Sequence, residues 1–278
     1  MTRTRVVVTP DGRVELDGDL VRARRLPDED GRVRVALVAS QALLLAGDDV
    51  RIEVDVAAGH ALEIVEVTGT VAYDMRGGHA SWIVDVRLAA DAVLVWPSLP
   101  FVVADGADVL RLTHVDLAAG ARAVLRETLV LGRSGEAGGR VRTTVRARLG
   151  GRPLLVETFV AEPAAVLDPA LLDGARCLDT LLVLGARLDH PGALQLEREG
   201  TMLRAMATRA HDADLGGIVA DAVEAATFPG GGRTDVVPPA RTRASRTTVA
   251  GTAVTPRAGA AVTPRVDAAV TPAGAPAG

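Results

Sequence analysis

The residues best suited to chemistry in this 278-residue chain are carboxylates that stand within or beside apolar segments. Most should lie on the solvated faces of half-buried strands, because alternation places them opposite Val and Leu. Glu127 differs: an apolar run follows it, and a carboxylate there needs an Arg, a backbone donor or a cation as its partner. Such oxygen ligands can hold a divalent metal ion transiently. The full set is Asp48, Glu53, Glu63, Glu66, Glu127, Glu136 and Glu157.

A Gly-rich segment, residues 131–139, suggests two enzyme motifs, and neither fits. A phosphate-binding loop ends in Gly-Lys-Ser/Thr, and the chain contains no Lys. A nucleophile elbow around Ser134 would need Gly at the position of Glu136. We therefore interpret the segment as a polar turn between two strands.

The spacing of His and Cys predicts no local metal site. None of the five histidines has a partner two to five positions away. A site assembled in space from His60, His79 and His114 with nearby carboxylates remains an alternative, although separate surface or capping roles are favoured. The single cysteine, Cys177, excludes an intrachain disulfide and fits a small buried hydrophobic residue.

The charge distribution argues against nucleic acid as a partner. All 31 basic residues are Arg, yet the formal charge is −4, and residues 1–228 alone carry 25 Arg against 33 acidic residues, a charge of −8. A nucleic-acid-binding domain is normally basic. No apolar stretch reaches the roughly 18 residues of a membrane helix, and the first ten residues lack the apolar core of a secretory signal. With one cysteine as well, we expect a cytoplasmic protein without membrane contact.

Period-two alternation predicts that residues 1 to about 160 are all β. Pairs of Gly and Asp separate the alternating runs and supply the turns. Only six residues are aromatic, so Val, Leu and Ala must fill the core, which requires many closely packed strands. The predicted strands include residues 51–56, 62–67, 81–88, 123–130 and 140–149.

The pattern changes towards the C-terminal end. Amphipathic spacing predicts two short helices in a helical segment over about 201–228. The first rests on Leu203, Met206, Ala207 and Ala210, and the second on apolar positions from Leu215 to Ala226.

Residues 229–278 differ in composition from everything before them. They contain three copies of Ala-Val-Thr-Pro, and such a repeat neither pairs in a sheet nor continues a helix. We predict one folded domain, residues 1–228, followed by a disordered tail, residues 229–278.

Several segments, in chain order, resemble the UreD family of urease accessory proteins, called UreH in some organisms. The most specific is residues 126–136, Arg-Glu-Thr-Leu-Val-Leu-Gly-Arg-Ser-Gly-Glu, which is similar to the family's Leu-Gly-Arg followed closely by Gly-Glu. The family's usual Gly-Gly-Asp is here Ala46-Gly47-Asp48. The other matching segments are residues 43–54, 59–62 with 67–73, 94–100 and 152–157.

This resemblance implies a mostly β body in which many short strands form a coiled, β-helix-like or layered arrangement with a small helical C-terminal segment. It implies a maturation factor that is not an enzyme, binds apo-urease, and recruits the accessory proteins UreF and UreG for nickel insertion. It also implies that Ni²⁺ passes transiently through an internal polar tunnel, with no tightly bound cofactor, and it allows a homodimer within the accessory complex. The alternative is a non-catalytic β-rich binding scaffold for another metalloenzyme.

The resemblance and the carboxylate pattern together nominate two groups of site residues. Carboxylates without a Cys or His cage would bind Ni²⁺ weakly enough to release it. The residues expected along a nickel path are Asp48, His60, Glu66, Glu127 and Glu136. The residues expected to contact partners are Tyr73, Arg133, Leu215 and Ile218.

Overall fold

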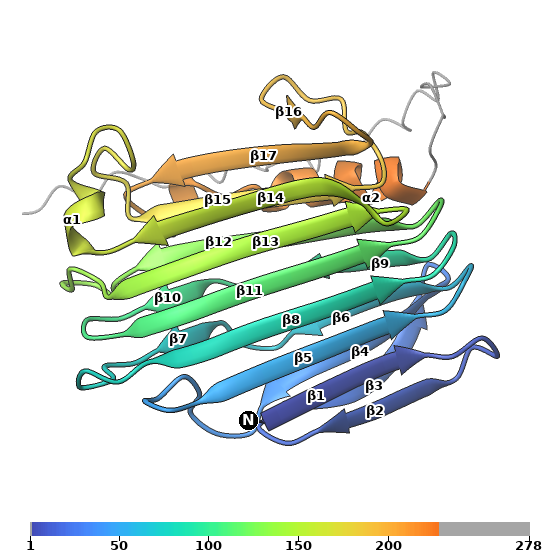
Figure 1. Cartoon of the computed structure of the whole chain (residues 1–278), viewed down its shortest axis with the longest axis horizontal. Coiled ribbons are helices and arrows are strands. Elements are labelled where there is room, and N and C mark those ends of the chain that lie inside the picture. The colour runs from blue at the N-terminus through green and yellow to red at the C-terminus, as the bar shows by residue number, and fades with distance from the viewer. Residues whose placement is uncertain (1, 228–278) are drawn as a thin grey trace, which may run out of the picture. The chain divides into compact units, whose positions relative to one another are not determined.

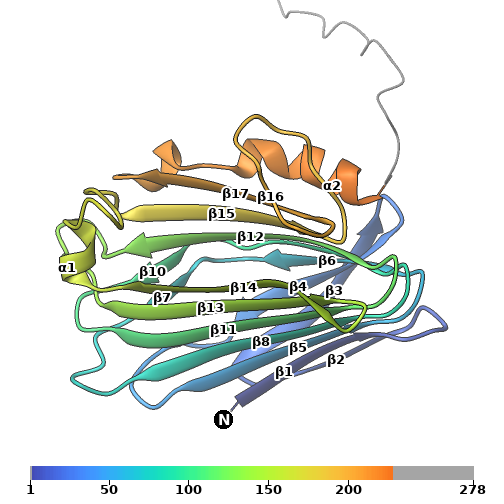
Figure 2. The ribbon, with the colours of Figure 1, turned by 45° about the horizontal axis from the view of Figure 1, so that its top comes forward.

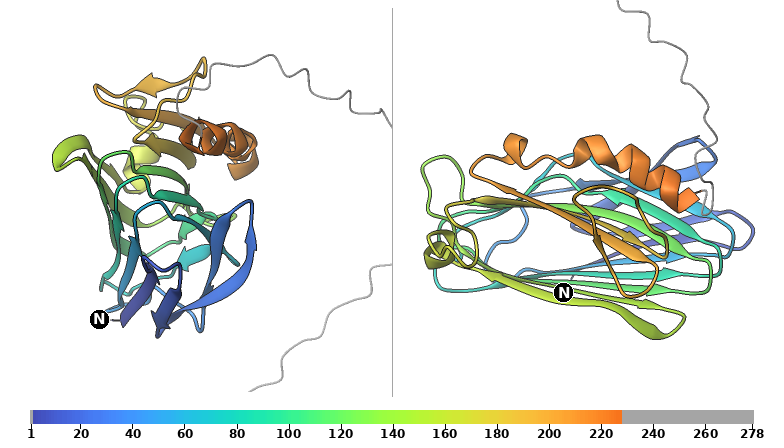
Figure 3. Two further views of the ribbon diagram at one scale, coloured as in Figure 1. Left: turned by 90° about the vertical axis from the view of Figure 1, so that its right-hand side faces the viewer. Right: turned by 90° about the horizontal axis from the view of Figure 1, so that it is seen from above.

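Two β-sheets face each other in this protein, whose computed structural model describes residues 2–227. The view along the strands shows both layers (Figure 3, left). The chain passes back and forth between the sheets, so that β11 (Asp108–Leu117) and β12 (Arg122–Leu131) are consecutive but belong to different sheets. This winding is the coiled, layered β arrangement that the resemblance to the UreD family implies.

The first sheet has seven strands, and five of them run parallel. Antiparallel strands close its two edges (Figure 1). In spatial order the strands are β14 (Arg152–Ala161), β13 (Arg140–Leu149), β11, β8 (Ala80–Leu88), β5 (Asp49–Val56), β1 (Thr2–Val8) and β2 (Val14–Gly18).

The second sheet has ten strands, of which β4, β6, β9 and β12 form a parallel centre. Two short strands, β7 (Thr70–Ala72) and β10 (Phe101–Val103), pair with each other, and β10 also pairs with β12. Along the main path lie β16 (Leu194–Gln195), β17 (Gly200–Ala207), β15 (Cys177–Leu184), β12, β9 (Val93–Pro97), β6 (Ala61–Glu66), β4 (Arg32–Ala39) and β3 (Val21–Glu29).

Alternation decides which side chains enter the core. In β5, Asp-Val-Arg-Ile-Glu-Val-Asp-Val, every second residue is buried, which places the aliphatic side chains between the sheets and the charged ones outside. All five strands predicted from alternation are present within one or two residues of the expected ends. The turns between them use Gly where predicted, as at Gly47 and Gly138, whose positive φ angles Gly adopts without steric cost.

The C-terminal segment corrects one prediction. Residues 200–207 form strand β17, antiparallel to β15, instead of the expected first helix. The strand is buried on both faces, since Met202 packs between the sheets and Leu203 packs on the outer side of the second sheet. A strand covered on both faces has no polar alternation, so a helical spacing matched it by coincidence.

The second predicted helix is present as α2 (Val219–Thr227), preceded by single 3₁₀ turns at Ala210–Asp212 and Gly216–Ile218. It covers the outer face of the second sheet over a small apolar cluster (Figure 2). A further short helix, α1 (Pro163–Val166), follows β14. No helix within residues 2–227 is long and apolar enough to cross a bilayer. The predicted tail, residues 229–278, lies outside the described residues.

Candidate functional site

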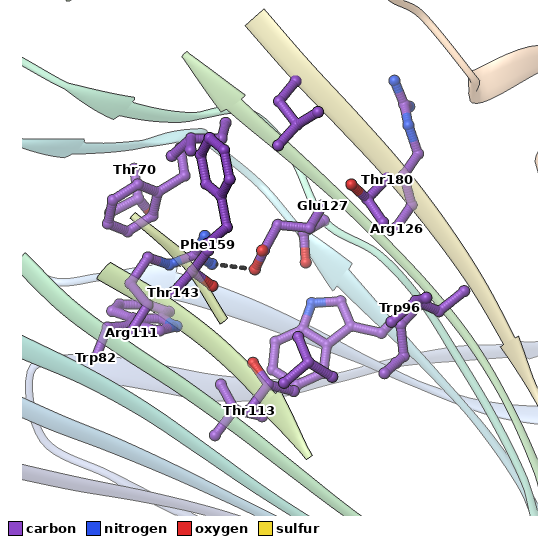
Figure 4. A pocket seen from close by; sticks show the side chains of 18 of the residues that line it. Thr70, Trp82, Trp96, Arg111, Thr113, Arg126, Glu127, Thr143, Phe159 and Thr180 are labelled. Atoms are coloured by element: carbon purple, nitrogen blue, oxygen red, sulfur yellow. Dashed lines mark hydrogen bonds and ion pairs between the residues drawn. The ribbon is translucent and has the colours of Figure 1, made fainter. Parts of the chain in front are cut away.

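The two sheets leave a cavity between them where β11, β13 and β14 face β12, β15 and β17 (Figure 4). It holds about 80 Å³ of space that water can occupy. At roughly 10–15 Å³ for each water, a small cluster of waters fits. The walls combine Trp82, Trp96, Phe101 and Phe159 with several Thr side chains and six charged residues, Glu66, Arg111, Arg126, Glu127, Glu157 and Arg204.

The strand register explains why charged residues reach this cavity. On the second sheet, Glu127, Thr180 and Arg204 are directly paired across β12, β15 and β17, so their side chains share the inner face. On the first sheet, Arg111 pairs with Thr143 and Glu157 pairs with Val145, which puts both charged residues on the opposing inner face. Each sheet therefore contributes two of these charged side chains to the cavity.

Arg111 and Glu127 form an ion pair across the cavity, from Nη2 to Oε1 (dashed line in Figure 4). The Arg111 side chain is only 7% exposed, and its guanidinium carbon lies 4.1 Å from the centre of the Phe101 ring, a cation–π geometry. Its Nε and Nη1 have no hydrogen-bond partner among residues 2–227. Glu127 is thus the carboxylate that neutralises this buried cation.

A second ion pair joins the sheets with the charges reversed. Arg204 of the second sheet donates from Nη1 and Nη2 to the two carboxylate oxygens of Glu157 in the first sheet, at 2.9 and 2.7 Å. Its Nε donates to Thr180 Oγ1 at 3.2 Å. Both charged side chains are about a quarter to a third exposed, so this pair lies nearer to solvent than Arg111 does. Bidentate geometry of this kind fixes both side chains.

Glu66 provides the third carboxyl group of the cavity, at the end of β6. It accepts hydrogen bonds from Trp96 Nε1 and from the Leu99 backbone N–H, both at 2.9 Å. Burial raises the pKa of Glu66 above its ordinary value, although these two donors and the nearby Arg111 charge act in the opposite direction. The cavity therefore contains one carboxyl group that holds its proton more tightly than a surface Glu.

The structure brings two of the five residues expected on a nickel path, Glu66 and Glu127, to the cavity. Asp48 instead organises a turn, where its Oδ2 accepts the Leu45 backbone N–H at 3.0 Å. His60 lies in the turn between β5 and β6, with Nε2 3.2 Å from the Pro10 carbonyl oxygen. Glu136 lies in the loop between β12 and β13, also outside the cavity lining.

The Glu136 loop is held together by its own charges. Glu136 accepts hydrogen bonds from the Arg133 guanidinium at 2.8 Å and from the Arg133 backbone N–H at 2.9 Å. These bonds, with a weaker one from the Asp105 N–H, lower the pKa of Glu136 to about 2. Two expected partner-binding residues thus belong to this end of the molecule, since Arg133 extends from the loop, more than half exposed, and Tyr73 follows β7.

The other two expected partner-binding residues lie beneath or beside α2. Leu215 is buried in the apolar cluster on the outer face of the second sheet, and Ile218 packs against that cluster while partly exposed. The Leu215 N–H donates to the fully buried Asp179 carboxylate at 2.7 Å. Asp179 also accepts from Arg126 at 2.8 Å and Thr128 at 3.1 Å, so it ties the C-terminal segment to the sheet.

Sequence reasoning missed Arg111 and Arg204, and it named Glu157 only as one of several carboxylates. A signal for Arg111 exists, because it stands in phase with the buried residues of an otherwise alternating strand, Val109, Val115 and Leu117. An Arg at an inward position predicts a buried anionic partner. Arg204 gives no such signal, because the apolar spacing around it matches a helix as well as a strand.

Metal-binding groups are sparse in the described region. No three side chains of His, Cys, Asp or Glu converge in residues 2–227. The alternative site of His60, His79 and His114 is therefore not formed there, and His114 instead bonds Asp85 at 3.0 Å on the outer face of the first sheet. Arginine or Trp96 already engages each of the three cavity carboxyl groups, so an entering cation would have to compete for them.

A comparison with models of known protein families shows to which family the chain belongs. The model of the family described as UreD urease accessory protein matches residues 20–230, which is most of the chain. The chain belongs to the UreD family. The matched range contains every charged residue of the cavity and the Glu136 loop.

Individual members of the family confirm the match. The urease accessory protein UreD 1 of Streptomyces griseus is 47% identical over 129 residues, 45% of this chain and 51% of that protein. The UreD protein of Streptomyces coelicolor is 38% identical over 126 residues, 43% and 50% of the two chains. That of Frankia casuarinae is 38% identical over 125 residues, 41% and 39%. The aligned part of the chain thus spans about half the length, or less, of these curated relatives.

Proposed function

We propose that this UreD-family chain is a maturation factor for urease that passes Ni²⁺ through the cavity between its two sheets. The observation that carries the proposal is that three carboxylates, Glu66, Glu127 and Glu157, line the cavity between the sheets at separate points. Carboxylate oxygens bind divalent cations, and a set without thiolate or paired imidazole ligands favours transit over retention. Nickel is the cargo in this account and not a resident cofactor.

The ion pairs give the cavity a mechanism for weak binding. A cation that binds Glu127 must displace Arg111, and one that binds Glu157 must displace Arg204. Each displacement leaves a guanidinium with fewer partners, and that cost lowers the affinity for the metal. When the metal leaves, the Arg returns to its carboxylate. Exchange between Arg and metal therefore keeps the carboxylates satisfied before and after passage.

The partners in the proposal are apo-urease, UreF and UreG, in the cytoplasm, and the chain itself performs no turnover. Arg133, in the loop between β12 and β13, and Tyr73, which follows β7, are available for partner contacts. Leu215 is committed to the core, so contact near α2 would come from Ile218 and the exposed edge of the helix. A homodimer within the accessory complex is part of the same proposal.

The direct test of the biological role is urease activation at limiting nickel in a strain that lacks this chain. We expect active urease to fall to background and to return when the full chain is supplied. Co-purification of the chain with apo-urease and UreF, with and without residues 229–278, checks the partners. Unchanged activation, or a folded chain that captures neither partner, would contradict the proposal and favour a β-rich scaffold with another client.

A further inference from the structure

We propose that the outer side of β13 and β14 is a docking surface for an extended acidic segment of a partner protein, which adds to β14 as a further strand. The surface consists of Arg142 and Arg146 on β13, Val156 and Val160 on β14, and Leu110 on β11. We call it the β14 surface. It lies on the solvent side of the first sheet and is separate from the cavity.

The first argument is the free edge of β14. This ten-residue strand ends the first sheet, and its only strand partner among residues 2–227 is β13 (Figure 1). Edge strands of natural proteins are normally short, charged or interrupted by Pro, because their unpaired backbone groups attract other strands. In β14, Pro153 lies at the beginning, and Glu157 points inward and is neutralised by Arg204. The register with β13 also shifts between Leu155 and Pro153, so the regular part of this edge runs from Leu155 to Ala161.

The second argument is the apolar area beside this edge. Val156 is 66% exposed and Val160 is 41% exposed, both on the outer face of β14. Leu110 of β11 is 37% exposed on the same face of the sheet. Three exposed aliphatic side chains around one strand pair form a patch that a partner could cover.

The third argument is uncompensated charge. On β1, β5 and β8 of the same sheet the outward Arg side chains have acidic partners, as in Arg3 with Glu53, Arg51 with Asp85 and Arg87 with Asp55. No carboxylate of residues 2–227 lies within 4.0 Å of Arg142 or Arg146 (the salt-bridge distance), although the folded region is strongly acidic. Both are exposed.

The register places these charges between the apolar side chains. Arg142 pairs with Val160 on one side and Leu110 on the other, and Arg146 pairs with Val156 and His114. A strand added to β14 would lie about 9–10 Å from β13, at about 4.8 Å per strand, a distance that an Arg and a Glu side chain can bridge together. The complementary segment therefore carries carboxylates on its outer face and pairs with β14 through its backbone.

The charge of the β14 surface also distinguishes between the segments that could pair with β14. A second copy that paired its own β14 with this one would place its Arg142 and Arg146 row about 14 Å away, three strand spacings, and would bring no carboxylate to either row. A partner with Glu or Asp on alternate residues neutralises the row instead. The acidic segment is thus the occupant that fits both the edge and the charges.

The test uses the full chain and two synthetic ten-residue peptides, one of alternating Glu and Val and one of alternating Lys and Val. Fluorescence anisotropy should show at least tenfold tighter binding of the Glu peptide, weakening as salt rises. Arg142→Glu/Arg146→Glu should reverse the preference, and Arg142→Gln/Arg146→Gln should abolish it. The matched control, Arg3→Glu/Arg5→Glu on the far side of the same sheet, should leave the preference unchanged.

Hydrogen exchange with the Glu peptide bound should protect backbone amides of β14 and leave those of β2, the opposite edge, unchanged. Equal binding of the two peptides, equal loss in the Arg3/Arg5 control, or binding without protection of β14 would each overturn the proposal. So would a self-associated state, seen by sedimentation, in which β14 is protected without peptide, because a second copy would then be the occupant. None of these measurements involves urease or nickel, so they are independent of the proposed function.

Discussion

Arg111 and Glu127 are 16 residues apart in the chain, lie in different sheets, and meet inside the cavity as an ion pair. The winding of the chain makes this meeting possible, because each coil sends one strand to each sheet and brings inward residues of consecutive strands face to face. Glu157 and Arg204 join the same two sheets with the charges exchanged. Two ion pairs therefore cross the cavity, and in each pair the Arg and the carboxylate neutralise one another.

The Arg111–Glu127 link predicts strong coupling between the two residues. Glu127→Met should lower the free energy of unfolding by about 2–4 kcal/mol, because it leaves a buried guanidinium without its counter-charge. Arg111→Met should cost a similar amount, and the double variant should cost clearly less than the sum of the two. Urea denaturation at pH 7 measures all three values. Additive losses would show that the pair does not act as a unit.

Asp179 predicts a different kind of loss, at the C-terminal segment. Asp179→Asn weakens its bonds to Arg126, Thr128 and the Leu215 N–H, and we expect a destabilisation of about 3–5 kcal/mol together with faster hydrogen exchange in α2. Asp214→Asn is the matched control, because Asp214 bonds the same Arg126 but is mostly exposed. Its effect should stay below about 1 kcal/mol. Unchanged exchange in α2 for Asp179→Asn would contradict the anchoring role.

The sequence predicts the strands of the first 160 residues well because their outer faces are solvated and alternate in polarity, as in β5. It fails at β17, where Met202 and Leu203 are buried on opposite faces. Glu127 was predictable as an unusual carboxylate because it lies beside apolar residues in a strand. Its partner was not, since the pairing of Arg111 with Glu127 depends on how the sheets face each other, and no local pattern encodes that.

Glu66 predicts a pH dependence of stability. Its pKa is raised in the folded state, so the folded protein binds more protons than the unfolded chain between the unfolded value, about 4.3, and the raised value. Stability contributed by Glu66 therefore falls as pH rises through that window. Glu66→Gln removes this contribution while its amide oxygen can still accept from Trp96 and Leu99.

We accordingly expect the free energy of unfolding of the natural protein, relative to Glu66→Gln, to decrease from pH 4.5 upward and then to level off. At neutral pH the variant should be at least as stable as the natural protein. Urea denaturation across this pH range gives the difference. A relative stability that increases with pH would contradict the raised pKa.

Glu136 predicts the opposite slope. Its pKa is lowered to about 2 by the Arg133 bonds, so the stabilisation that it provides is complete above about pH 4.5 and is lost as pH falls towards 2. Glu136→Gln should loosen residues 132–139 at neutral pH, and amide exchange in that loop measures this. The difference between the variant and the natural protein should shrink in acid. A difference that is constant from pH 5 to pH 2 would show that the carboxylate charge is not what holds the loop.

The central claim is that cavity carboxylates carry nickel towards urease, and reconstituted activation of apo-urease at limiting Ni²⁺ tests it most directly. Two double variants are compared, Glu66→Gln/Glu127→Gln in the cavity and Glu53→Gln/Glu63→Gln on the outer faces, which remove the same number of acidic groups. We predict at least a tenfold lower initial rate of activation for the cavity variant, with partner complexes still formed, and a normal rate for the surface variant. Equal rates for the two folded variants would contradict the account.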